Sequence, residues 1–303
     1  PSRHALRLRI RLRAARDNPY SLGLRKSSAM MLRHTWAKID THGPSSVYIA
    51  SDSRISWGTA ASFDYGRKVF SFSRWPDVLG YCGDVLFPSI ALNQIVELAD
   101  AGLLFAPDFS CKQKFQAIVG KLNDLFQEYP QLHSGISENS LSIIHASRDS
   151  KDNSKFACYT ISWTSKLGWH GDESALPKSS DVLFALGTGA PEFRANFSRY
   201  KVGTNRETSR AVFQCFCDTL TQISDPLVGG APQLVGIYRK PSSPGFTVGI
   251  VFNGKRYFLG AHIDNGRNLD TVEWRNGNFE RCNGRAMVKL PDAQPQPDPL
   301  RRL

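Results

Sequence analysis

Residues 47–84, VYIASDSRISWGTAASFDYGRKVFSFSRWPDVLGYCGD, decide the fold of this chain. They contain three short apolar runs, each of a length and composition typical of a β-strand. The first run ends at Asp52, and Lys68 follows sixteen residues later at the start of the second run. An acid and a lysine at the ends of neighbouring strands can meet across a sheet. The lysine keeps the aspartate ionised, and the aspartate holds the lysine where it can tune a nucleophile.

This stretch resembles the opening of the proteasome-type N-terminal-nucleophile (Ntn) hydrolases, which include the proteasome β subunits and simpler bacterial relatives. The family has an apolar run ending in Ala-x-Asp, and the Asp-to-Lys spacing is the same here. Its Arg-Lys-Val run is matched at Arg67–Val69, and its Gly-x-x-Gly turn at Gly80–Gly83. The resemblance extends over about residues 32–260. It implies an α+β fold, a four-layer αββα sandwich in which two antiparallel sheets are covered by helix pairs.

The order of the expected elements agrees with that architecture. Strands at 32–40 and 47–52 precede two helices, expected over 86–104 and 114–129 from their apolar stripes. Strands at 141–147, 156–164 and 182–186 precede two further helices, which begin near Pro191 and Thr208. Strands at 233–238, 246–252 and 256–260 end the pattern, whereas residues 170–173 are expected to form a loop. A doubly wound parallel sheet would need strands and helices in strict alternation, which this chain does not show.

The nucleophile implied by the resemblance is the first residue of the first strand, exposed by cleavage, with its own α-amine as the base. Such an amine has a pKa near 8, so much of it can accept a hydroxyl proton at neutral pH. Thr35 is the candidate, although the family's spacing from Asp52 falls on Trp36; a single bulge would absorb the difference. In a group of bacterial proteasome-like proteins aligned on Trp36, the threonine falls at Met31 instead. Thr35 also has a structural interpretation, as a β-branched residue in a strand.

Two later turns are the remaining candidates implied by the resemblance. Residues 187–189, Gly-Thr-Gly, correspond to the family's Gly-Ser-Gly turn, in which Thr188 would supply the hydroxyl that reaches the nucleophile's amine. Asp225 and the glycines at 229–230 correspond to the family's Asp-x-x-Ser-Gly-Gly turn. Val228 stands where that turn has its serine, which removes one hydrogen-bonding hydroxyl.

Charge and composition restrict the other classes of function. The net charge is +11, but residues 1–26 contribute +7, which leaves +4 for the rest of the chain. We therefore expect no nucleic-acid partner, because a basic surface interleaved with aromatic residues is lacking in the folded part. No apolar run reaches the ~20 residues of a membrane span. The six cysteines show no paired CxxC spacing, so they are expected to be reduced and mostly buried, as in the cytoplasm.

We expect three parts: a basic leader over 1–30, disordered or absent from the mature protein, an Ntn-hydrolase-like domain over 31–290, and a Pro-rich tail over 291–303. By resemblance, the protein is expected to be a threonine-type peptidase that cleaves amide bonds in a peptide or protein substrate and assembles in rings, with no cofactor and no metal. Thr35 would attack, Lys68 would favour its deprotonation, Asp52 would orient Lys68, and Thr188 and Asp225 would position the amine. The alternative is a non-catalytic proteasome-like structural or binding subunit.

Overall fold

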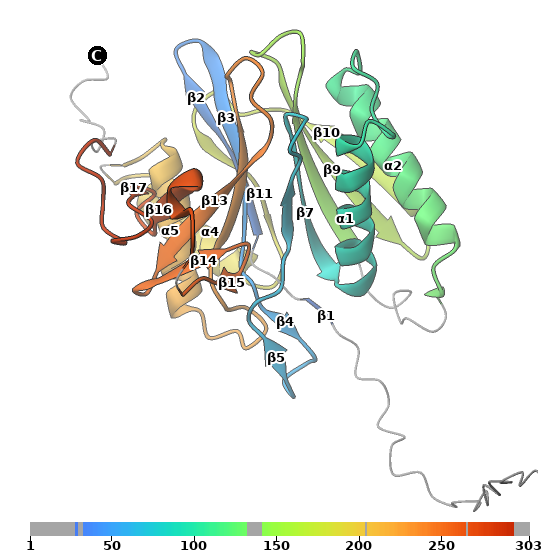
Figure 1. The fold of residues 1–303 in the computed structure, drawn as a ribbon. Coiled ribbons are helices and arrows are strands. Elements are labelled where there is room, and N and C mark those ends of the chain that lie inside the picture. Colours follow the sequence, from blue (N-terminus) through green and yellow to red (C-terminus); the bar gives the residue numbers. More distant parts are fainter. Residues whose placement is uncertain (1–27, 30–32, 132–140, 204, 265, 294–303) are drawn as a thin grey trace, which may run out of the picture.

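The computed structural model describes residues 28–29, 33–131, 141–203, 205–264 and 266–293. Within these ranges the chain forms two large, mainly antiparallel sheets and four α-helices (Figure 1). No helix of the described part is both long and apolar enough to cross a membrane. Most of the expected leader and tail, including Met31, lies outside the described residues. Ser28–Ala29 forms β1, which pairs with Gly83 and Asp84.

The first sheet has the strand order β1-β7-β8-β9-β10, with β6 also paired to β7. Its remaining strands are β6 (Val69–Ser71), β7 (Asp77–Asp84), β8 (Leu141–Arg148), β9 (Phe156–Thr164) and β10 (Gly168–Ser174). The two helices α1 (Leu86–Asp100) and α2 (Cys111–Gln127) pack on this sheet through one buried apolar cluster. Ser110 caps α2, and its capping box with Gln113 satisfies backbone donors of the first turn.

The second sheet has the strand order β11-β2-β3-β12-β13-β14-β15. These strands are β2 (Arg33–Asp40), β3 (Gly43–Ser51), β11 (Asp181–Leu186), β12 (Gln233–Tyr238), β13 (Phe246–Phe252), β14 (Lys255–Phe258) and β15 (Ala261–His262). Two further helices, α4 (Ala190–Tyr200) and α5 (Ser209–Gln222), pack on it through a second buried cluster. A third cluster joins the two sheets: it unites Val47 and Ile49 of β3 with Val78 of β7 and Ile144 of β8.

Smaller elements complete the chain. A short hairpin of β4 (Ile55–Ser56) and β5 (Ser62–Phe63) projects from one end of the molecule (Figure 1). The 3₁₀ helix η2 (Leu269–Thr271) leads to β16 (Glu273–Asn276) and β17 (Arg281–Cys282). β16 pairs in parallel with β13, in a sheet whose other pairings are antiparallel.

Most of the expected strands and helices are confirmed to within a few residues, but the expected loop at 170–173 is wrong. These residues belong to β10, which pairs antiparallel with β9 along its whole length. Gly171 lies so close to α2 that a Cβ atom there would come within 2.8 Å of the Phe115 ring. β10 ends the strand order of its sheet and its side chains are largely exposed, so it lacks the apolar pattern by which strands are recognised.

Candidate active site at the end of β3

Asp52 and Lys68 form a buried ion pair, as their spacing predicts. Lys68 Nζ lies 3.0 Å from Asp52 Oδ1, and both side chains are completely buried. Asp52 directly follows β3, and Lys68 directly precedes β6, so the pair joins the ends of strands from the two sheets. The other carboxylate oxygen, Asp52 Oδ2, accepts hydrogen bonds from the backbone N–H groups of Gly229 and Arg54. These contacts compensate the cost of burying the carboxylate.

Gln233 organises the backbone around this pair. Its side chain is completely buried, and Nε2 donates to the carbonyl oxygens of Asp52 and Gly66 and to the hydroxyl of Ser53. Its Oε1 accepts the backbone N–H of Lys68. This one amide group thus forms hydrogen bonds with four polar groups, which lie at the two ends of the connection between β3 and β6. Sequence reasoning missed this residue, because a glutamine at the start of an apolar strand carries no local signal.

Arg54 fixes the turn that contains Gly229 and Gly230. Its guanidinium binds the Asp64 carboxylate through two nitrogens, at 2.7 and 2.8 Å, and also donates to the carbonyl of Val228. The hydrogen bonds from Arg54 hold the pKa of Asp64 below its ordinary value. Gly229 is required there, since a Cβ atom would lie 2.5 Å from the guanidinium carbon of Arg54. The glycine therefore allows its own N–H to reach Asp52.

Asp225 and Thr188 lie in turns at the same end of the second sheet as the ion pair. Asp225 is half-buried, and its carboxylate accepts the backbone N–H of Leu227 within its own turn. Thr188 is exposed in the turn between β11 and α4. Leu186, two residues earlier, pairs with Arg33, which pairs with Ser51 on its other side. Two strand spacings, about 10 Å, thus separate the ends of β11 and β3.

Thr35 lies inside the sheet and not at a chain end. It pairs with Ile49 of β3 on one side and with Phe184 of β11 on the other. Its side chain is completely buried, and its hydroxyl has no hydrogen-bond partner among the described residues. Arg33, which pairs with Ser51 directly before Asp52, lies two positions nearer the ion pair. Two strand residues correspond to about 7 Å.

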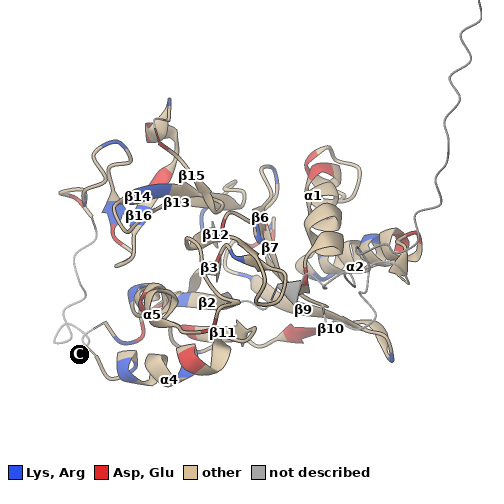
Figure 2. Ribbon diagram, turned by 90° about the horizontal axis from the view of Figure 1, so that it is seen from below, with Lys and Arg blue, Asp and Glu red and all other residues tan. Residues whose placement is uncertain are grey.

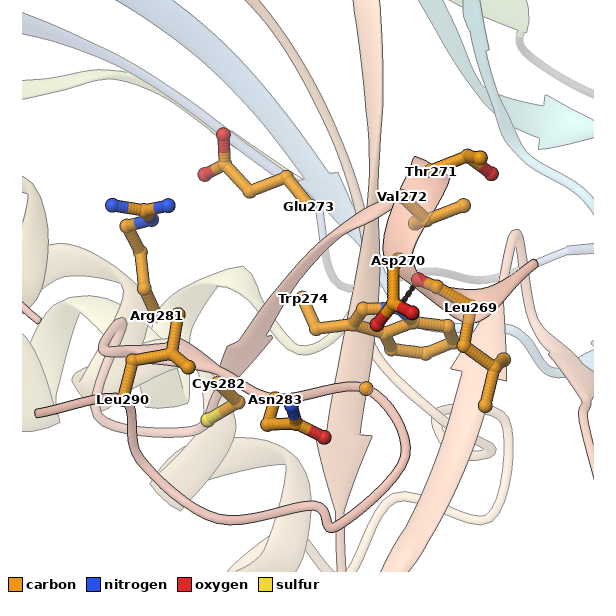
Figure 3. Close-up of a pocket in the computed structure, with 11 residues that line it drawn as sticks. Leu269, Asp270, Thr271, Val272, Glu273, Trp274, Arg281, Cys282, Asn283 and Leu290 are labelled. Atoms are coloured by element: carbon orange, nitrogen blue, oxygen red, sulfur yellow. Dashed lines mark hydrogen bonds between the residues drawn. The ribbon is translucent and has the colours of Figure 1, made fainter.

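The pocket in Figure 3 is separate from this site. It has a volume of about 340 Å³ and is lined by η2, β16, β17 and the loop that follows β17. The figure shows the indole of Trp274 at its centre, with a hydrogen bond to the carbonyl of Leu269. None of the five residues expected to be catalytic lines it. Within the described ranges, no group of three or more His, Cys, Asp or Glu residues could hold a metal ion.

Comparisons with known proteins give structural neighbours only. No protein-family model and no curated protein sequence matches this chain significantly. Solved structures that overlap with it include Anbu (ancestral beta-subunit) from Yersinia bercovieri, with 9% identity, a TM-score of 0.49, and coverage of 75% of this chain and 87% of that chain. The helical assembly of the Anbu complex from Pseudomonas aeruginosa is 17% identical, with a TM-score of 0.47, and the overlap covers 71% of this chain and 86% of that chain. Eukaryotic HslV from Trypanosoma brucei is 10% identical, with a TM-score of 0.42, and the overlap covers 68% of this chain and 99% of that chain.

Proposed function

We propose that this protein is a proteasome-like subunit with the αββα architecture of the Ntn hydrolases, and that it acts without catalysing hydrolysis. Three buried clusters support the architecture: one joins the two sheets, and each of the others joins one sheet to its pair of helices. The Asp52–Lys68 pair, at the strand ends where the resemblance implies it, supports the kinship. A buried ion pair alone is weak evidence for catalysis, since many such pairs are structural.

The position of Thr35 carries the non-catalytic proposal. A terminal nucleophile needs a free α-amine and room for a substrate, whereas Thr35 is completely buried between two paired strands. The six residues before it, 29–34, read Ala-Met-Met-Leu-Arg-His and contain no hydroxyl or thiol. Serine, threonine and cysteine are the nucleophiles that an adjacent amine can activate. The six residues directly before Thr35 therefore offer no substitute for its hydroxyl.

Cleavage before Thr35 would also cost contacts of the second sheet. It would remove Arg33, which pairs with both Ser51 and Leu186. It would remove His34 as well, whose ring stacks on Phe193 of α4 at a centroid distance of 3.5 Å. Aromatic pairs of this kind contribute about 0.5–1.5 kcal/mol beyond their buried area. These contacts favour a chain that keeps residues 33–34.

The second candidate is the threonine-type peptidase, favoured by the preserved geometry of the ion pair. In that function, Thr35 after processing would attack the amide carbonyl of a peptide or protein substrate, with its α-amine as base. Lys68 would favour deprotonation of the hydroxyl, Asp52 would orient Lys68, and Thr188 and Asp225 would position the amine. In either function, the proposal includes a cytoplasmic protein, association of the chain with copies of itself in rings, and no cofactor.

The N-terminal residue of the mature protein tests the choice between the two. We expect the intact mass to show that residues 33–34 are retained, and a covalent warhead selective for N-terminal threonines to leave the protein unlabelled. A Thr35→Val variant, which keeps the β-branched shape, should then behave like the natural chain in both measurements. A mature chain that starts at Thr35 and is labelled there, with the labelling abolished by Thr35→Val, would establish the peptidase instead.

A further inference from the structure

A cavity of about 400 Å³ is lined by three arginines and by no acidic residue of the described chain. Arg256 belongs to β14, Arg267 to the loop between β15 and η2, and Arg285 to the loop after β17. The remaining lining residues are Gly266 and Leu269. The ion pair of the candidate active site does not line this cavity, so an inference about it does not depend on the proposed subunit function.

Arg256 ties both loops to β14. Four backbone carbonyl oxygens accept hydrogen bonds from its guanidinium, those of Ile263, Asp264, Gly284 and Arg285. The first two acceptors belong to the loop that carries Arg267, and the last two to the loop that carries Arg285. All three nitrogens of Arg256 thus have partners. Its contribution to the cavity is therefore to fix the two loops and to supply positive charge.

No carboxylate of the described chain pairs with Arg256. Its four acceptors are neutral carbonyl groups, and the side chain is half-buried. The carboxylate of Asp264 is directed to His262, with Oδ1 3.2 Å from Nδ1. Figure 2 shows the basic segment on β14, where Lys255 directly precedes Arg256. A cleft lined by charge of one sign raises the local concentration of ions of the opposite sign.

Arg267 and Arg285 supply the free donors of the cavity. Both side chains are exposed, and neither guanidinium forms a hydrogen bond or an ion pair with a described residue. An arginine presents its N–H groups as a planar fork that matches two oxygens of one phosphate or carboxylate group. Three cations in one cavity also repel each other, and a bound anion relieves this repulsion.

The backbone holds both free arginines at the cavity. Gly266 packs so closely on Leu269 that a Cβ atom would lie 2.6 Å from a methyl carbon of that leucine. Leu269 is only 5% exposed, so it anchors the loop that carries Arg267. On the other side, Asn283 Oδ1 accepts the backbone N–H of Arg285 at 2.9 Å. Fixing these loops in advance reduces the entropy that is lost when a ligand binds.

We propose that this cavity binds a compact diphosphate anion. One phosphate group would pair with Arg267 and the other with Arg285, and the charge of Arg256 would add to the attraction. A terminal phosphate group presents three acceptor oxygens where a carboxylate presents two, which favours a diphosphate over a carboxylate ligand. The lining contains no aromatic side chain, so a nucleotide base would gain no stacking contact there. The cavity volume falls in the range of small-molecule sites.

The test is calorimetric titration of the full chain at constant ionic strength and without divalent cations. The probes are pyrophosphate, inorganic phosphate, citrate and adenosine diphosphate. We expect saturable binding of pyrophosphate that is tighter than that of phosphate or citrate, and no tighter binding of adenosine diphosphate. The Arg267→Gln/Arg285→Gln variant should bind pyrophosphate about a hundredfold more weakly, at about tenfold per charged partner. Its melting temperature without ligand should stay at or above that of the natural chain, because neither guanidinium has a partner among the described residues.

A matched control is the Lys166→Gln/Arg199→Gln variant. It removes two exposed cations, from the turn between β9 and β10 and from α4, neither of which lines the cavity. Its net charge equals that of the first variant, and it should keep the natural affinity for pyrophosphate. An equal loss of affinity in both variants, natural affinity in the first variant, tighter binding of citrate or adenosine diphosphate than of pyrophosphate, or no saturable binding of pyrophosphate would overturn the proposal.

Discussion

The buried group of Asp77, Lys114 and His145 offers the sharpest stability test of this structure. Asp77 Oδ2 lies 2.5 Å from Lys114 Nζ, and Oδ1 is 2.8 Å from His145 Nε2; all three side chains are completely buried. Lys114 also donates to the carbonyl of Arg148. Replacing Lys114 with methionine keeps most of the volume but leaves a buried carboxylate without its cation.

We expect Lys114→Met to lower the free energy of unfolding by about 3–5 kcal/mol at neutral pH, the usual cost of removing one partner of a buried pair. Natural domains are stable by only about 5–15 kcal/mol in total. Burial alone would raise the pKa of Asp77, but Lys114 and His145 together bring it below its ordinary value. The natural chain therefore keeps this stabilisation above the ordinary aspartate pKa and loses it as the pH falls through the lower, folded value.

In Lys114→Met the effect of burial on Asp77 is no longer offset by the lysine. Protonation of Asp77 or His145 then relieves the unpaired charge, so the difference in stability between the variant and the natural chain should shrink as the pH falls towards 4. Denaturant unfolding followed by fluorescence at several pH values measures this difference. The control is Lys121→Met on the same helix, whose lysine pairs with Asp124 at 3.5 Å at the surface and should matter by less than about 1 kcal/mol. Equal losses in the two variants, or a difference independent of pH, would refute the reasoning.

Three further outcomes are expected. Burial holds the pKa of His34 well below 6.5, so only the unfolded chain gains a proton at this residue as the pH falls through that value. The natural chain therefore loses stability between pH 7.5 and 5.5. His34→Leu should reduce this loss by up to about 1.4 kcal/mol per pH unit, as measured by denaturant unfolding. Gly245→Ala should lower the melting temperature, because its Cβ would lie 2.4 Å from the carbonyl oxygen of Asp77, whereas Gly120→Ala in open space on α2 should raise the free energy of unfolding by about 1 kcal/mol. Cys82 is partly exposed whereas the other five cysteines are buried, so a thiol reagent should modify Cys82 first in the native protein and the others upon unfolding.

Local patterns in the sequence were sufficient for most strands and helices of this fold. The apolar stripes of α1 and α2 have a helical period, and strands such as β8 and β12 are short apolar runs, so period and length identify them. The Asp52–Lys68 pair was predictable for a similar reason, because both residues stand at strand ends separated by a short stretch of chain.

Contacts between distant segments were not predictable from one sequence. Gln233 acts on groups about 165–181 residues earlier in the chain, and no periodic pattern encodes such a pairing. Thr35 lies within the strand expected over 32–40, but the pairing of that strand with β11, more than 140 residues later, was not predictable, and this pairing places Thr35 inside the sheet.

The parallel pairing of β16 with β13 has a consequence for how the molecule avoids misassembly. β16 occupies backbone donors and acceptors along residues 248–251 of β13, and the Trp274 indole fits over Gly249, where a Cβ atom would come within 2.5 Å of the ring. A strand whose edge is open is a template for another chain. The segment after η2 thus covers the edge of β13, an apolar strand of that sheet. In a protein shortened before Glu273, the backbone groups of β13 that pair with β16 would be open to strand addition from another chain.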